Sequence, residues 1–267
     1  MTPETFVVPL DGSAYAERAL PVATALARRV DGRLLLVSVL ERGPLHPDAY
    51  LDEVAARVLD VKVETIGVKD RYAADAVASI VSESPDRIVC MTSHGRGGFR
   101  WGLVGSVAEE VVRRAERPTL LVGRHCRDDF LDGANMLVCV DGSESSMRLA
   151  PAATAWADRL GLDLHAAIVV HPLDVESAEH PHALLDPIVA QLGGADRVTA
   201  TMIRARYVEG ALADRAAELG AALIAVNSHG RTGLARIALG STTMALLHQA
   251  PCPLLVTALR TPGATTR

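Results

Sequence analysis

The sequence predicts an α/β protein made of two Rossmann-like, doubly wound domains, each a five-stranded parallel sheet with helices on both faces. Short apolar runs alternate with amphipathic helical patterns, the whole series occurs twice, and each copy carries a glycine-rich loop between its fourth strand and the next helix. Continuous apolar strands are typical of parallel sheets covered on both faces. Right-handed crossovers then produce the doubly wound arrangement.

The repeat divides the chain. FVVPLDGS at 6–13 matches MLVCVDGS at 136–143, 130 positions later, and His94 matches His229, 135 positions later. Because the order of the motifs is kept, we interpret the chain as a tandem duplication of one domain. The expected division is a first domain at 1–123, a polar linker at 124–134, a second domain at 135–259 and a disordered tail at 260–267.

In the first copy, five apolar runs predict strands. They are residues 6–10, 33–40, 61–68, 87–91 and 119–122. The helices expected between them are one capped by Ser13, with residues 16, 20, 23, 27 and 30 on its inner face, then 49–59, 73–82 and one that starts after Ser106. Asp31-Gly32 is expected to end the first of these helices as a turn.

The second copy repeats this series. Its expected strands are residues 136–140, 164–170, 198–208, 222–226 and 253–257. Its expected helices are 143–160, 211–219 and one after Ser241, and the stretch 171–187, rich in proline and histidine, is expected to hold a variable loop and a helix.

Composition narrows the class of protein. Apolar residues make up 49% and aromatic residues 3%, so the cores must be aliphatic. A net charge of −5 argues against a general nucleic-acid binder. The four cysteines show no CxxC pair and no metal-ligand spacing, which predicts buried free thiols in a reducing compartment. Without a signal-peptide pattern or a membrane-length apolar run, we expect a cytoplasmic protein that has no contact with membranes.

The most informative stretch is MTSHGRGGFRWGLVGS at 91–106, between a strand and a helix. NSHGRTGLARIALGS at 227–241 repeats its Ser-His-Gly-Arg and Gly-Ser spacing. Glycines let backbone N–H groups approach a phosphate, and the helix dipole and Arg96 add positive potential. Asp11-Gly12-Ser13 is expected at the same sheet edge, where its carboxylate could accept from a ribose or adenine group. The pattern therefore predicts a nucleotide site in each copy.

Other chemistries lack their motifs. The chain has no GxxxxGK[ST], GxGxxG, HExxH or GxSxG sequence, and the spacing of His171, His180 and His182 fits no known metal site. We therefore predict no catalytic residues and no metal site.

The chain resembles the universal stress protein family in a tandem, two-domain form. The ATP-binding members of that family carry G-x2-G-x9-G-[ST] after the fourth strand, and here the first glycine is replaced by Thr92 and Asn227. The resemblance implies a stress-response regulator that binds adenine nucleotide, with ATP as cofactor, alone or with Mg²⁺. It implies the following nucleotide-binding residues: Asp11, Val39, Met91, Thr92, His94, Gly95, Arg96, Gly98, Gly105, Ser106, Val107, Asp141, Val169, Val226, Asn227, His229, Gly230, Arg231, Gly233, Gly240, Ser241 and Thr242.

The two predicted sites are not identical. Asn227 tolerates a positive φ better than the β-branched Thr92 does, and Ser106-x-x-Glu109 reads as a capping box that puts acid where a phosphate would sit. Both points favour the second copy. Against them, the first copy has Arg100 and the extra pair Gly97-Gly98.

Simpler interpretations stay open for each motif. Ser106 and Ser241 could be helix caps, His94 and His229 loop-packing groups, Arg96 and Arg231 solvated charges, and Asp11 and Asp141 turn caps. Two other functions also stay open, a slow ATPase or phosphotransferase and a protein-interaction module without nucleotide. The family tends to pair through its last strand, so residues 119–122 and 253–257 are the candidates for joining the halves or for a homodimer.

Overall fold

The computed structural model describes residues 4–40, 47–70, 72–93, 105–115, 117–174, 181–194, 197–228 and 239–257. The first half contains the strands β1 (Thr5–Pro9), β2 (Arg33–Leu40), β3 (Lys62–Lys69), β4 (Arg87–Thr92) and β5 (Thr119–Val122). Its helices are the 3₁₀ turn η1 (Ala16–Arg18), α1 (Ala19–Arg29), α2 (Pro47–Ala56), α3 (Ala73–Ser82) and α4 (Ser106–Arg114).

The second half follows a second 3₁₀ turn, η2 (Phe130–Asp132). Its strands are β6 (Asn135–Val140), β7 (Asp163–Val170), β8 (Val198–Arg204), β9 (Ala221–Asn227) and β10 (Leu254–Thr257). Its helices are α5 (Glu144–Met147), α6 (Ala150–Leu160), α8 (Pro181–Leu192), α9 (Val208–Glu218) and α10 (Ser241–Gln249).

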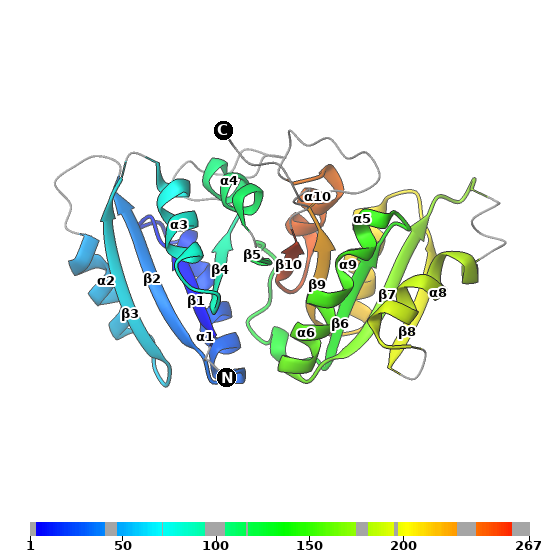
Figure 1. The fold of residues 1–267 in the computed structure, drawn as a ribbon, viewed down its shortest axis with the longest axis horizontal. Helices are drawn as coiled ribbons and strands as arrows, with labels where there is room; N and C mark the ends of the chain where they lie inside the picture. The colour runs from blue at the N-terminus through cyan, green and yellow to red at the C-terminus, as the bar shows by residue number, and fades with distance from the viewer. Residues whose placement is uncertain are drawn as a thin grey trace.

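All of these strands belong to one sheet, in the order β3-β2-β1-β4-β5-β10-β9-β6-β7-β8. Within each half the strands are parallel. In the first half α3 packs on α4 in front of the sheet, and in the second half α9 packs on α10 behind it (Figure 1). The predicted α/β class and the two doubly wound units are therefore confirmed.

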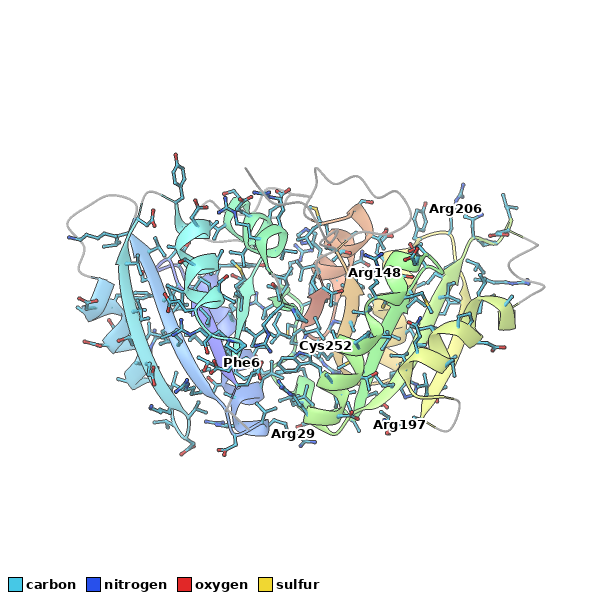
Figure 2. All side chains as sticks on the ribbon, in the orientation of Figure 1. Phe6, Arg29, Arg148, Arg197, Arg206 and Cys252 are labelled. Carbon is cyan, nitrogen blue, oxygen red and sulfur yellow. The ribbon has the colours of Figure 1, made fainter. Side chains whose placement is uncertain are left out.

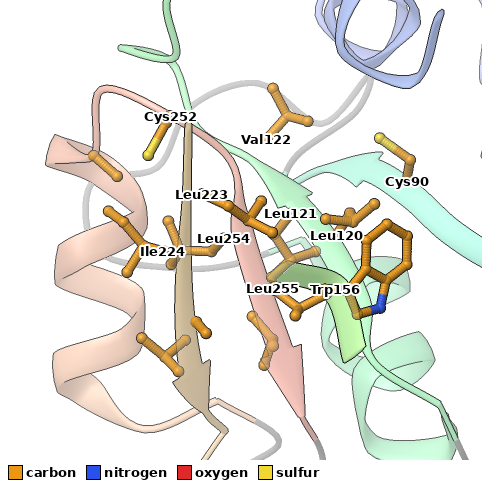
Figure 3. Close-up of a cluster of buried hydrophobic side chains, with 14 of the residues drawn as sticks. Cys90, Leu120, Leu121, Val122, Trp156, Leu223, Ile224, Cys252, Leu254 and Leu255 are labelled. Carbon is orange, nitrogen blue, oxygen red and sulfur yellow. The ribbon is translucent and has the colours of Figure 1, made fainter. Parts of the chain in front are cut away.

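The halves meet where β5 and β10 pair antiparallel, with Leu121 opposite Leu254 and Leu120 opposite Leu255. The expected joining of the halves through these strands is confirmed. All four leucines are fully buried, and Figure 3 shows them in one cluster with Trp156 of α6. The ring of Trp156 also meets Phe6 of β1 edge to face at 6.1 Å. One hydrophobic core therefore runs through both halves.

Two expected elements differ clearly from the structure. The single helix expected at 143–160 is two helices, α5 and α6, because Pro151 at the start of α6 cannot donate the backbone hydrogen bond that a continuous helix needs. The strand expected at 198–208 ends at Arg204, and Val208 instead begins α9. An apolar, β-branched residue suits either element, so its sequence alone could not place that boundary.

The expected inner face of the first helix is also partly wrong. Leu20 and Val30 are only half-buried, whereas Val22 and Leu26 lie in the core. The 3₁₀ turn η1 precedes α1, and its tighter winding shifts the phase of any helical pattern counted from residue 16. The polar stretch after β5 is not fully solvated either, because its Phe130 is 1% exposed.

Candidate functional site

The carboxyl ends of β1 and β6 carry the same turn. The Oδ1 atom of Asp11 accepts the backbone N–H of Ser13 at 3.0 Å and its hydroxyl at 2.6 Å, and Asp141 does the same with Ser143 at 3.0 and 2.6 Å. The residue between them is glycine in both halves, with φ of 82° at Gly12 and 79° at Gly142, values that side chains disfavour. The interpretation as turn caps is therefore confirmed, and this geometry fixes each half-buried carboxylate at the sheet edge.

Each turn also begins the following helix. The hydroxyl of Ser13 accepts the N–H of Ala16 at 3.1 Å, and that of Ser143 accepts the N–H of Ser146 at 3.2 Å. The capping role predicted for Ser13 is thus confirmed, and its counterpart in the second half repeats it.

The neighbouring strands β4 and β9 end at Thr92 and Asn227, which replace the motif's first glycine. Both are nearly buried, at 4% and 8% exposed. Among the described residues, a positive φ outside glycine occurs at Asp31 and Asp60, so neither replacement carries the backbone strain of a positive φ. The expected advantage of asparagine over threonine is therefore wrong, since both residues lie in extended strand.

The glycines that precede α4 and α10 close the loops in the same way. The N–H of Gly105 donates to the carbonyl of Ser93 at 2.7 Å, and that of Gly240 donates to Ser228 at 2.6 Å. Each glycine is the helix N-cap in extended conformation. In each half, one hydrogen bond thus holds together the two residues that flank the glycine-rich loop, Ser93 with Gly105 and Ser228 with Gly240.

This closure overturns the predicted capping box. Ser106 and Ser241 are the first helical residues, their side chains are exposed, and no side chain in the described part of either region caps the helix. The reason is that the bond to Ser93 makes Gly105 the last extended residue, and its carbonyl accepts the N–H of Glu109 at 3.0 Å. The alternative reading of these serines as caps is wrong for the same reason.

The second half adds two hydroxyls that the motif did not identify. Thr243 donates to the carbonyl of Asn227 at 3.0 Å, and Thr257 donates to the Oδ1 of Asn227 at 2.5 Å. The equivalent positions of the first half hold Ala108 and Gly123. Aligning the two copies residue by residue would have revealed this difference, because a hydroxyl stands opposite a residue without one at both positions.

The other expected residues divide into three groups. Val39 and Val169 lie half-buried near the ends of β2 and β7, and Val107 is half-buried in α4. Met91 and Val226 are buried under the site and Thr242 is exposed. The remaining predicted residues lie outside the described part of the chain: His94, Gly95, Arg96, Gly98, His229, Gly230, Arg231 and Gly233, together with Gly97, Arg100 and the tail at 260–267.

Charge separates the two sites. Near Asp11, the Tyr50 hydroxyl donates to Glu17 at 3.0 Å and Arg57 pairs with Glu17 at 2.9 Å. Burial raises the pKa of Tyr50, and the charges of Glu17 and Asp11 raise it further. The second half has Met147 and Met244 where the first has Glu17 and Glu109. At these two positions the first half therefore carries carboxylates that the second half lacks.

The described residues contain no cluster of three or more metal-ligating side chains. All four cysteines are free thiols, as predicted; Cys90 and Cys252 are buried, Cys126 and Cys139 half-buried. Burial raises the pKa of each thiol, so all four stay protonated at neutral pH. Among the described helices, none has the length and apolar composition needed to span a bilayer.

Comparison with known proteins fits the duplicated architecture. The family model described as the universal stress protein family matches residues 3–123 and again 134–258. The chain belongs to the universal stress protein family. A universal stress protein of Mycobacterium tuberculosis is 32% identical over 220 residues, which cover 76% of this chain and 70% of that protein.

Two further relatives match one half of the chain and nearly the whole chain, respectively. A universal stress protein of Thermus aquaticus is 30% identical over 135 residues, covering 45% of this chain and 98% of its own length. The solved structure of a universal stress protein from Archaeoglobus fulgidus superposes on this universal stress protein with a TM-score of 0.67 at 19% identity, covering 97% of this chain and 99% of that one. At that identity the likeness establishes the fold alone.

Proposed function

We propose that this universal stress protein is a stress-response regulator that binds an adenine nucleotide, ATP in the first place, in each half. The observation that carries the proposal is that both halves repeat two hydrogen-bonded closures, the aspartate turn and the glycine-to-serine bond before the helix. The closures lie on neighbouring strands, because β1 pairs with β4 and β6 pairs with β9. In each half this is the point where the strand order reverses, at which open α/β sheets bind ligands.

We assign a part of the nucleotide to each group. The carboxylates of Asp11 and Asp141 suit ribose hydroxyls, and the valines at the ends of β2 and β7 offer an apolar surface for the base. Phosphates suit the first N–H groups of α4 and α10, together with the exposed hydroxyls of Ser106 and Ser241. The arginines and glycines of the loops are expected to add to this phosphate contact. Mg²⁺ could accompany the phosphates, with the aspartate as its nearest described ligand.

The test begins with nucleotide bound to the purified full-length protein. The protein is denatured, and adenine nucleotides in the supernatant are counted per chain by ion-exchange chromatography. Nucleotide-free protein is then titrated with ATP by calorimetry, with and without Mg²⁺. Two nucleotides per chain support two working sites and one supports a single site. If no nucleotide is carried and none binds, the proposal fails.

Ser106→Asp and Ser241→Asp test the phosphate contact without harming the fold. An acid in the first helical turn stabilises a helix, yet it repels a phosphate at the same place. Each variant should lose the nucleotide of its own half only. Ser106→Asn and Ser241→Asn are the matched neutral controls and should retain binding. Equal binding by the aspartate and asparagine variants would show that the phosphates lie elsewhere.

The fold does not favour the alternative of an interaction module that dimerises through its last strands. The strands expected to form a homodimer, β5 and β10, are each paired on both sides within the chain. A dimer through them would require two copies to exchange these strands, and light scattering after size exclusion would detect it.

A further inference from the structure

Two exposed tyrosines occupy equivalent positions in the two halves. Tyr72 and Tyr207 lie 135 positions apart, the same offset as the loop motifs, and each is the N-cap residue of the helix after the third strand of its half. Their exposed fractions are 64% and 68%. Aromatic residues make up only 3% of the chain, so matched exposure of two of them calls for a reason.

The backbone holds both tyrosines in the same conformation. Tyr72 has φ −135° and ψ 103°, and Tyr207 has φ −116° and ψ 109°. Each tyrosine carbonyl accepts the N–H four residues ahead, from Ala76 at 3.2 Å and from Ala211 at 3.3 Å. Because both the backbone and its hydrogen bonds agree, the two side chains leave the chain in the same direction relative to their own sheets.

Strand register relates both tyrosines to the proposed base surface in the same way, because each follows by four residues the position that pairs with its valine. Val39 of β2 pairs with Val68, and Tyr72 follows Val68 by four residues; Val169 of β7 pairs with Ile203, and Tyr207 follows by four as well. In the second half, the N–H of Ala205 donates to the carbonyl of Val170 at 3.1 Å. Tyr207 is two positions after Ala205, and two residues span at most about 7 Å.

Local stability does not explain a tyrosine at these positions. Ser, Thr, Asp, Asn and Gly are the favoured N-cap residues, and in the described structure neither tyrosine side chain makes a capping bond. Their exposure also rules out a role in the hydrophobic core. An exposed aromatic ring, by contrast, is the surface on which a nucleobase stacks.

We propose that Tyr72 and Tyr207 stack against the purine base of the nucleotide bound in their own half and so position it. The inference rests on the nucleotide binding proposed above. Each tyrosine follows an arginine in the sequence, Arg71 and Arg206. Arg206 is exposed and lies at the upper end of the second half in Figure 2, well away from Arg197 at the lower end. Its charge there adds to the attraction for an anionic nucleotide.

The test compares a ligand that has a base with one that has none. Nucleotide-free full-length protein is titrated by calorimetry with ATP and, separately, with inorganic tripolyphosphate. Tyr72→Ala and Tyr207→Ala should each weaken ATP binding at one site by about tenfold and leave tripolyphosphate binding unchanged. Tyr72→Phe and Tyr207→Phe keep the ring and should bind ATP as the wild type does. Leu59→Ala removes a comparably exposed apolar side chain, 66% exposed, and is the control for general surface effects.

The outcomes separate this inference from the proposed function. If the wild type binds ATP and the alanine variants bind it equally well, stacking is overturned while nucleotide binding stands. If the alanine variants lose ATP and tripolyphosphate to the same extent, the tyrosines support the fold of the site and the stacking role is again overturned. If the wild type binds no ATP, the proposed function itself fails.

Discussion

The two halves of the chain agree at one edge of the sheet and differ at the other. At the carboxyl ends of the strands, the aspartate turns and the glycine closures agree within 0.1 Å in their hydrogen-bond lengths. At the amino ends, the first half has a network centred on buried carboxylates, whereas the second half has an amide and an imidazole. The edge that we propose to bind nucleotide has thus kept one geometry, whereas the opposite edge has changed its chemistry.

The charged network of the first half is centred on two buried carboxylates. Glu4, 5% exposed, pairs with Arg117 at 3.0 Å and also with Arg159 of the second half. Asp86 accepts the hydroxyl of Thr5 at 2.8 Å and pairs with Arg33 at 3.3 Å. Burial by itself would raise the pKa of Asp86, but the hydroxyl donors and Arg33 outweigh it and lower that pKa.

The second half builds its amino edge from an amide and an imidazole. The Nε2 atom of His165 bonds the Oδ1 of Asn135 at 2.9 Å, and the Nδ2 of Asn135 donates to the carbonyl of Leu219 at 2.7 Å. Because an amide oxygen only accepts, His165 must donate from Nε2. Its buried Nδ1 has no hydrogen-bond partner among the described residues.

The two halves also contribute different contacts to the junction between them. Arg159 of α6 and Arg29 of α1 are equivalent residues, and each crosses to the other half. Arg159 reaches the Glu4 carboxylate, whereas Arg29 donates to the carbonyl of Leu160 at 3.1 Å. Glu4 has Ala134 as its counterpart, so the two crossings cannot be exchanged. The junction between the two halves is therefore asymmetric: it has an ion pair on one side and a bond to a neutral carbonyl on the other.

The largest expected effect is on the free energy of unfolding, and it should differ between alanine variants of Gly123 and of its equivalent, Thr257. A Cβ at Gly123 would lie 2.1 Å from the carbonyl oxygen of Leu247, so the backbone would have to move. Gly123→Ala should lower the free energy of unfolding by about 3 kcal/mol. Thr257→Ala loses the bond to Asn227 and should cost only about 1 kcal/mol. Urea denaturation followed by circular dichroism measures both. Similar losses would remove the proposed difference between the equivalent strand ends.

The next effect concerns the junction. Glu4→Gln removes the charge that holds Arg117 and Arg159 and should cost about 2 kcal/mol in unfolding free energy. Arg29→Ala removes one bond to a neutral carbonyl and should cost about 1 kcal/mol or less. The same urea titration applies. Arg28→Ala is the control, because it removes an exposed pair with Asp60 and a bond to the carbonyl of Leu59, both within the first half. A loss in Arg29→Ala as large as that in Glu4→Gln would show the crossings to be equivalent.

A smaller effect should appear in nucleotide affinity. Glu109 lies in the first turn of α4, and Met244 takes its place in α10. A carboxylate at that point opposes a phosphate, so Glu109→Met should tighten ATP binding in the first half by about two- to fivefold, and Met244→Glu should weaken it in the second. Isothermal titration calorimetry at low salt measures the change. Glu110→Gln is the control, since Arg113 already holds that carboxylate at 2.8 Å and lowers its pKa. Affinity changes of the opposite sign would mean that the helix ends do not face the phosphates.

The smallest effect is a difference in pH sensitivity. Burial and the nearby Arg215 lower the pKa of His165, so the unfolded chain binds a proton more readily than the folded one. Stability should therefore fall as the pH drops below about 6.5, the ordinary histidine value. Asp86, whose pKa is also lowered, should contribute stability that is lost only at more acidic pH, near and below about 4.

His165→Leu tests the contribution of the histidine. Leucine is chosen because it occupies the equivalent position, 35, of the first half. Urea midpoints from pH 7.5 to 5 should decline by less in the variant than in the wild type. His171→Leu, an exposed histidine, is the matched control and should follow the wild type. Parallel pH profiles for all three proteins would count against a neutral, half-buried His165.

Much of the fold could be predicted because it depends on local patterns. The sequence predicts the strands at 33–40 and 119–122 and the helix at 73–82 with the bounds that the structure has, since turn residues bound these apolar patterns. The errors arose where a local pattern competes with its context. Pro151 split one helix, and a bond from Gly105 to Ser93, twelve positions away, displaced the expected cap at Ser106.

By itself, the sequence determined the duplication, the parallel sheet and the family, because each of these follows from apolar periodicity or from repeated short motifs. It also identified the aspartate turns, whose hydrogen bonds join residues two positions apart. Only the tertiary structure decided the extended backbone at Thr92 and Asn227, the glycine caps, and the asymmetric junction through Glu4 and Arg159. The physical reason is distance along the chain. Glu4 and Arg159 are 155 positions apart, and no pattern within a helix or a strand records which carboxylate an arginine will meet once the core has closed.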